Sequence, residues 1–158
     1  MITQKLIDTI REMYQLNWNG IHGADHWARV RNNGLRLASV TGANTRVIEA
    51  FAFIHDSCRL SDGHDPDHGP RAAVFAESIN NTLLHLQSHE LNDLIDACTH
   101  HTRGGTSGFN MTVLTCWDSD RLDLGRVGIR PNPDYLCTEA ARRKEIIKWA
   151  YFNSLGSD

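Results

Sequence analysis

Histidine and aspartate gather at a few places in this chain, in combinations that could bind metal. There are nine histidines in 158 residues, a high count, and most of them lie beside aspartate or glycine. His55 and Asp56 form a doublet directly after the apolar run 50–54. A carboxylate buried at such a place is costly unless a cation or strong hydrogen bonds compensate it. The doublet therefore indicates a metal ion bound by imidazole and carboxylate.

More histidines flank the doublet in the sequence. His22 and His26 lie four residues apart, a spacing that could place both on one helix face. His68 follows a polar loop, and the pair His100-His101 ends an expected helix. Each is a further imidazole that could reach the same site.

Two carboxylates compete for one later position. Asp118 and Asp120 both belong to the segment 117–123, which mixes acidic residues with tryptophan and leucine. Residues two apart on a helix face roughly opposite sides, so only one of the two should point at a metal.

In this order the residues resemble the HD superfamily of metal-dependent phosphohydrolases. Members carry a histidine on an early helix, a His-Asp doublet on a central helix and an aspartate on a later helix. The resemblance covers about residues 20–128 and implies that His26, His55, Asp56 and Asp120 bind a divalent metal. It favours Asp120 over Asp118. The matching segments are His26-Trp27-Ala28-Arg29-Val30, Phe51-Ala52-Phe53-Ile54-His55-Asp56 and Asp120-Arg121-Leu122.

The resemblance also suggests a second metal. Binuclear HD enzymes add a histidine after the doublet and one or two before the last aspartate, which here are His68, His100 and His101. Of the adjacent pair, His101 is slightly favoured, and both could face the site. The segment 103–105 replaces the GYP signature of the branch that cleaves cyclic dinucleotides, so cyclic di-GMP is a poor guess for the substrate. Arg59 stands where many members have lysine.

Ligands of this kind, with no thiolate, suit Mn, Fe, Mg, Co, Ni or Zn, with one or two ions per site. A bound metal lowers the pKa of water and supplies hydroxide near neutral pH. Asp56 could bind metal through one oxygen and accept the water's proton through the other. Arg59, and with it Arg29, could offset charge on phosphoryl oxygens, while His68 and His101 hold a second metal or contact substrate. The expected reaction is hydrolysis of a nucleotide or another small phosphate ester.

Two other functions fit parts of the pattern. A few HD-fold proteins hold a di-iron pair and activate oxygen, and the extra histidines keep a di-iron oxygenase open. The second is a non-catalytic module that binds a nucleotide, although the presence of a ligand at every expected position argues against it.

Other prominent residues are expected outside the metal shell. Arg121 should pair with a neighbouring acid, Trp27 and Trp117 should lie in the core, and Cys58 should be an inert thiol. The remaining histidines are expected in loops, in an outer shell or on exposed helix surface: His22, His64, His85 and His89.

Helical periodicity predicts one all-α domain over 1–158, an HD-type bundle of about six to eight helices. The motif-bearing core is expected at about 20–128. The run 46–56 is apolar nearly all round, so this helix should be central and buried. Loops at 59–67, 103–111 and 125–137 should determine specificity. Helices are expected at 2–18, 24–40, 46–56, 66–86, 89–101, 112–124 and 138–153.

Composition narrows the class of partner. The net charge of −3 argues against a dedicated nucleic-acid surface. No stretch approaches the roughly 20 apolar residues of a membrane span, and no signal peptide begins the chain. The four cysteines form no C-x-x-C pair, which is typical of reduced thiols in the cytoplasm. The expected partner is a small phosphorylated substrate, and a homo-oligomer stays open.

Overall fold

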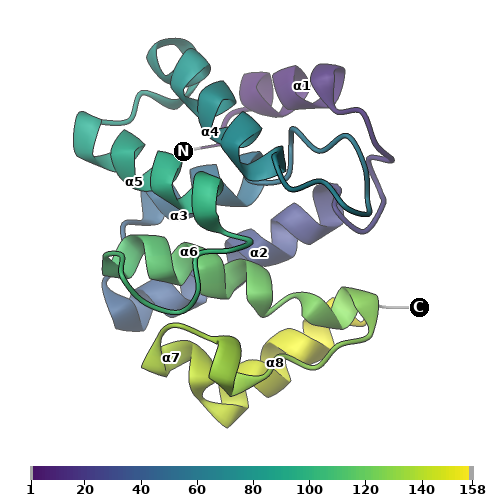
Figure 1. The fold of residues 1–158 in the computed structure, drawn as a ribbon, viewed down its shortest axis with the longest axis vertical. Coiled ribbons are helices and arrows are strands. Elements are labelled where there is room, and N and C mark those ends of the chain that lie inside the picture. The colour runs from purple at the N-terminus through teal and green to yellow at the C-terminus, as the bar shows by residue number, and fades with distance from the viewer. Residues whose placement is uncertain (1, 157–158) are drawn as a thin grey trace.

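The computed structural model describes residues 2–156, and within this range it contains helices and no strand. Figure 1 shows α7 and α8 at one end of the molecule, α1 and α4 at the other, and α2 and α6 between them. The all-α prediction is confirmed. The α-helices are α1 (Gln4–Met13), α2 (Ala24–Thr41), α3 (Thr45–Ile54), α4 (His68–Ile79), α5 (Ser88–His100), α6 (Met111–Arg121), α7 (Glu139–Arg142) and α8 (Lys144–Ser154).

Helix α3 is the centre of the larger core. It packs against α2, α5 and α6, and most of its residues are buried. Asn44 begins it by accepting hydrogen bonds from the backbone N–H groups of Arg46 and Val47. The prediction of a central, buried helix is therefore confirmed, and its C-terminal end carries the His-Asp doublet into the interior.

A second, smaller core joins the C-terminal helices to the rest. Leu37 of α2 and Leu122 meet apolar residues of α7 and α8 there. The expected helix over 138–153 is wrong in one respect, because it is broken in two. Arg143 adopts an extended backbone, with φ −64° and ψ 134°, between α7 and α8.

Other helix ends also differ from the expectation. The first helix ends at Met13, because Tyr14 is extended. The fourth begins at His68, and from Asn80 to Leu84 its last turn is a π-helix, η1. Short 3-10 turns lie in the expected irregular segment, η2 (Leu124–Val127) and η3 (Pro133–Tyr135). Within residues 2–156, no helix combines the length and the apolar character needed to cross a membrane.

Candidate metal centre

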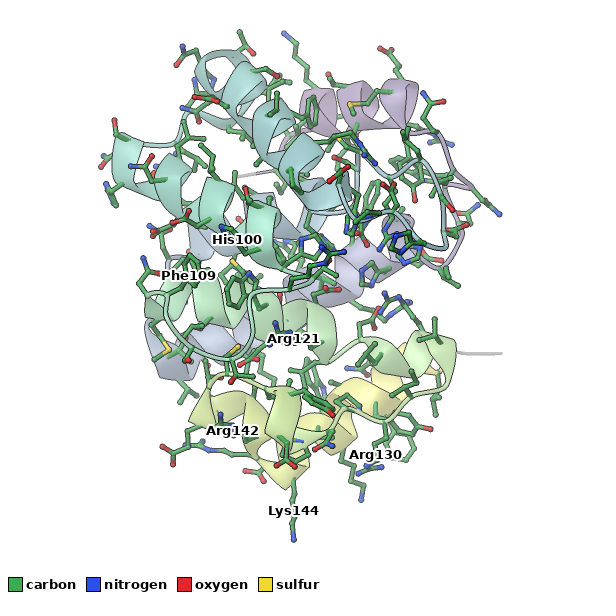
Figure 2. All side chains as sticks on the ribbon, in the orientation of Figure 1. His100, Phe109, Arg121, Arg130, Arg142 and Lys144 are labelled. Carbon is green, nitrogen blue, oxygen red and sulfur yellow. The ribbon has the colours of Figure 1, made fainter. Side chains whose placement is uncertain are left out.

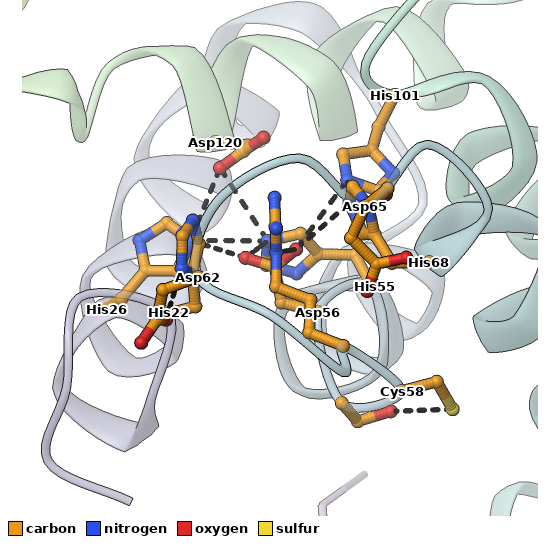
Figure 3. Close-up of polar contacts among 12 residues, drawn as sticks. His22, His26, His55, Asp56, Cys58, Asp62, Asp65, His68, His101 and Asp120 are labelled. Atoms are coloured by element: carbon orange, nitrogen blue, oxygen red, sulfur yellow. Dashed lines mark hydrogen bonds and ion pairs between the residues drawn. The ribbon is translucent and has the colours of Figure 1, made fainter. Parts of the chain in front are cut away.

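Six side chains from five places in the fold converge on one point (Figure 3). Most of them lie at helix ends, where the chain can turn a polar residue inward. Their side chains are almost fully buried, apart from Asp120, which is 19% exposed. They are His26 near the start of α2, His55 and Asp56 after α3, His68 at the start of α4, His101 after α5 and Asp120 near the end of α6.

The first group contains His26, His55, Asp56 and Asp120. The Nε2 atoms of the two histidines are 3.2 Å apart. Asp56 Oδ2 lies 3.4 Å from His26 Nε2 and 3.3 Å from His55 Nε2. Asp120 Oδ1 lies 3.3 Å and 3.6 Å from the same two nitrogens. Two imidazoles and two carboxylates thus face a common centre.

The second group lies on the other side of Asp56. Its Oδ1 atom is 3.2 Å from His68 Nε2 and 3.7 Å from His101 Nε2, and the two nitrogens are 2.8 Å apart. Asp56 therefore turns one carboxylate oxygen to each group, and Figure 3 shows it between them. The two clusters His26–His55–Asp56 and Asp56–His68–His101 have the size needed to hold an ion each.

Hydrogen bonds at the far side of each ring determine where its proton lies. Nδ1 of His55 faces the carbonyl of Phe51 at 3.0 Å, and Nδ1 of His101 faces that of Cys98 at 2.7 Å. Nδ1 of His68 faces the carbonyl of Asp65 at 2.6 Å. Carbonyl oxygens only accept hydrogen bonds, so each Nδ1 donates and each neutral ring turns its Nε2 lone pair to the site.

The Nδ1 atom of His26 also faces a hydrogen-bond acceptor, which here is a carboxylate. Its Nδ1 lies 2.6 Å from Asp123 Oδ2, and Arg29 Nε donates to the other oxygen of Asp123 at 2.7 Å. Asp123 is fully buried. Sequence reasoning assigned it no role, although its spacing of three residues from Asp120 places both on neighbouring parts of one helical turn. Arg29 is thus bound to Asp123 rather than turned to the centre.

Charge around the centre favours bound protons or metal cations. Burial alone lowers the pKa of His26, but Asp120, Asp123 and Asp56 outweigh it and raise that pKa to about 8. The pKa of His55 rises to about 10, because Asp56 and Asp120 likewise outweigh burial. The histidines in turn hold the pKa of Asp56 and Asp120 well below the ordinary value, against the effect of burial.

Arg59 lies at the edge of the centre. Its Nε donates to Asp56 Oδ1 at 3.0 Å, and its Nη1 donates to the carbonyl of Ser61 at 3.1 Å. The side chain is 13% exposed. Arg59 and Asp120 are the more exposed residues around the site, so they indicate the side from which a substrate can approach.

Asp118 and Asp120 have separate surroundings. Asp118 accepts hydrogen bonds from the backbone N–H groups of Cys137 and Thr138, and from the Thr138 hydroxyl, each at 2.7 Å. It therefore attaches the segment before α7 to α6 and points away from the centre. Asp120 points into it.

His100 and His101 also differ. His101 is buried in the second group, whereas His100 is exposed and packs on Phe109, with ring centroids 5.4 Å apart (Figure 2). The structure does not bring His100, an expected candidate for the second metal, into either cluster.

His22 is buried beside the centre. Its Nδ1 lies 2.7 Å from Asp62 Oδ1, and its ring is 6.5 Å from that of His26 between centroids. His22 thus lies outside the two clusters, in one of the positions expected for it. The sequence did not identify Asp62 as its partner. The other three histidines are exposed: His64, His85 and His89.

The prediction that Arg121 pairs with a neighbouring acid is wrong. Its Nη1 donates to the carbonyl of Tyr135 at 3.0 Å and contacts Cys137 Sγ at 3.3 Å, and no carboxylate in the described part of the chain pairs with it. The guanidinium lies 5.5 Å from the ring centroid of Trp117. Trp27 and Trp117 are fully buried, as expected.

Comparison with known proteins supports the fold. No family model and no curated protein matches the sequence. The structure is similar to a crystal structure of a predicted HD superfamily hydrolase from an uncultured Thermotogales bacterium, with a TM-score of 0.73 and 21% sequence identity. The match covers 94% of this chain and 84% of that chain. The chain therefore shares the fold of that protein over most of its length.

Proposed function

We propose that this chain is a metal-dependent phosphohydrolase that holds two divalent ions. One observation carries the proposal: two pairs of Nε2 lone pairs face each other, at 3.2 Å for His26 and His55 and at 2.8 Å for His68 and His101. Two lone pairs at these distances repel unless a proton or a metal cation lies between or beside them, and the carboxylates of the site favour such a positive charge. The Nδ1 partners rule out the tautomer that would relieve this repulsion in the neutral rings.

The donor set fits divalent metal. His26, His55, Asp56 and Asp120 would hold one ion, and Asp56, His68 and His101 the other. Imidazole and carboxylate without thiolate suit Mn, Fe, Mg, Co, Ni or Zn. Such ions would lower the pKa of water and supply a nucleophile near neutral pH.

The chain's own residues would prepare the site. Asp123 holds the His26 ring in the required orientation, which is a common function of carboxylates behind metal-binding histidines. Arg59 orients Asp56, and its remaining N–H groups can bind a phosphoryl oxygen. Burial of the four imidazoles keeps bulk water away, so that charges in the site interact strongly. The substrate proposed for this arrangement is a nucleotide or another small phosphate ester.

A panel of phosphate esters supplied with each divalent metal tests the proposal. The wild-type chain should release 4-nitrophenol or phosphate, and His101→Ala should lower turnover by about 100-fold or more. His100→Ala is the matched control, because it removes the neighbouring, exposed histidine and should leave turnover unchanged. Absence of turnover with every metal and ester would contradict the proposal. Oxygen uptake by the iron-loaded chain without phosphate release would indicate the di-iron alternative instead.

A further inference from the structure

A pocket of about 420 Å³ lies between the loop after α5, the end of α6 and Tyr135. Thr102 and Arg121 contribute to its wall, and they directly follow His101 and Asp120 in the chain. Two residues of the pocket wall are thus the immediate chain neighbours of proposed metal ligands. The complete wall is formed by Thr102, Arg103, Gly105, Thr106, Arg121 and Tyr135.

The pocket wall is cationic. Arg103 and Arg121 contribute two positive charges, and none of the lining residues is acidic. Within residues 2–156, no carboxylate lies within ion-pair distance of either guanidinium. Two like charges on one wall repel each other, and a bound anion would relieve that repulsion.

Arg121 is held ready to bind such an anion. Its Nη1 is occupied by the Tyr135 carbonyl and Cys137 Sγ, and its guanidinium rests against the Trp117 ring. The N–H groups on Nε and Nη2 have no hydrogen-bond partner in the described part of the chain, so they stay available as a fork of donors. Fixing the side chain in advance reduces the entropy lost on binding.

A neighbouring pocket of about 320 Å³ shares Arg121 and Tyr135 with the first. Its other walls are largely apolar and include Leu124, Ile129 and Leu136. Figure 2 shows Arg121 and Arg130, which also lines this second pocket, on the same side of the molecule. Cationic and apolar surfaces thus lie next to each other in this part of the molecule.

On the basis of the proposed function, we propose that the substrate carries a second phosphate group, which binds to Arg103 and Arg121 while the first reacts at the metal centre. The Thr102 and Thr106 hydroxyls add donors, and a phosphate offers more acceptor oxygens than a carboxylate does. The apolar pocket receives the rest of the molecule. The substrate class is therefore a nucleotide with two separate phosphates, and specificity arises where the loops after α5 and α6 meet.

Kinetics with paired substrates provide the first test. Adenosine 3′,5′-bisphosphate should exceed adenosine 5′-monophosphate in kcat/KM by about tenfold or more, mainly through KM, since hydrogen bonds to charged groups carry that discrimination. Arg103→Gln and Arg121→Gln should remove this preference. Arg103 has no hydrogen bond from its side chain within the described residues, so its variant should fold even if Arg121→Gln does not. Arg36→Gln, an exposed arginine on α2, is the matched control and should keep the preference.

Calorimetry in excess chelator separates this inference from the proposed function. Arg103-dependent binding of adenosine 3′,5′-bisphosphate by the metal-free chain would support the pocket even if no ester is hydrolysed. Ester hydrolysis without an Arg103-dependent preference for the bisphosphate would overturn the inference and leave the proposed function intact. Phosphoglycolate carries a carboxylate as its second anion. An Arg103-dependent preference for phosphoglycolate as strong as that for the bisphosphate would overturn the assignment of phosphate.

Discussion

At the scale of single residues, Asp56 and the rings around it define the centre. Its Oδ2 atom faces the first pair of histidines and its Oδ1 atom faces the second. Behind the rings, carbonyl groups and Asp123 hold each Nδ1. The proposed ligands are therefore oriented before any ion binds.

Asp123 should matter for metal binding although it is not a proposed ligand. Asp123→Asn removes the charge behind His26 and one partner of Arg29. Metal affinity should fall about 10–100-fold, as for other carboxylates behind metal-binding histidines. Competition with a chromophoric chelator measures it. Asp134→Asn, at an exposed position in η3, is the control, and equal affinities for the two variants would contradict the role of Asp123.

Substitution of Asp118 should affect stability, and substitution of Asp120 should affect metal binding. Asp118→Asn places an amide among donors from Cys137 and Thr138, so the free energy of unfolding should fall by about 1–3 kcal/mol with metal content unchanged. Asp120→Asn should lower metal content, because it removes a proposed ligand. Denaturant unfolding and elemental analysis of both variants test this contrast, and the reverse pattern would refute it.

At the scale of elements, close contacts between helices place the ligands. A Cβ atom at Gly69 would lie 2.4 Å from the carbonyl oxygen of Cys98, so glycine allows α4 to approach α5 closely. The same two helices provide His68 and His101. The second group therefore depends on how closely these helices can pack.

Gly69→Ala should move α4 away from α5. Strain of this kind costs about 1–3 kcal/mol, and the wider spacing of His68 and His101 should weaken one of two metal-binding events. Thermal unfolding and metal titration measure both effects. Gly63→Ala is the control, since its Cβ would meet only the Ser61 hydroxyl at 3.5 Å. Two unchanged binding events in Gly69→Ala would show that this packing does not position the ligands.

Glu90 connects the starts of α3 and α5. It accepts hydrogen bonds from the Gln87 backbone N–H at 2.9 Å and the Asn44 amide at 3.0 Å, and it pairs with Arg46. Burial alone raises its pKa, but these contacts outweigh burial and lower it. Its ionised form is therefore favoured in the folded chain, and that stabilisation is present above the unfolded pKa and lost as pH falls through the folded pKa.

Glu90→Gln should lower the free energy of unfolding by about 1–2 kcal/mol at pH 7. The difference from wild type should begin to shrink near the ordinary pKa of glutamate, about 4.3, where Glu90 of the unfolded chain takes up a proton. It should continue to shrink below that pH, until the folded side chain is protonated as well. Urea unfolding at several pH values measures it, with exposed Glu145→Gln as the control. A difference independent of pH would contradict this account.

The sequence allowed the helices near the site to be predicted, but not every contact between them. The apolar run before His55 predicted a buried helix, and α3 confirms it. The break at Arg143 could not be predicted, because no proline or glycine marks it. The partners of Asp118 and Arg121 lie 14 to 20 residues further along the chain, so only the tertiary structure reveals them.

At the scale of the whole molecule, the proposed metal centre lies where α2, α3, α4, α5 and α6 meet. The layer of α7 and α8 adds the segment 129–136, which brings apolar surface and Tyr135 beside Arg121. Overall the chain is acidic, with a net charge of −3, yet the pocket between the loop after α5 and the end of α6 is cationic. A local field of this kind attracts an anionic substrate without a basic surface elsewhere.

Metal content of the purified chain, by elemental analysis after saturation and removal of free ions, tests the central claim most directly. We predict two divalent ions per wild-type chain and per His100→Ala chain, and one ion in His68→Ala or His101→Ala. His55→Ala should lower the metal content below that of His68→Ala and His101→Ala. It removes a ligand of the first group and also a contact of Asp56, which belongs to both groups. No retained ion in the wild type, or equal content in His100→Ala and His101→Ala, would contradict the account.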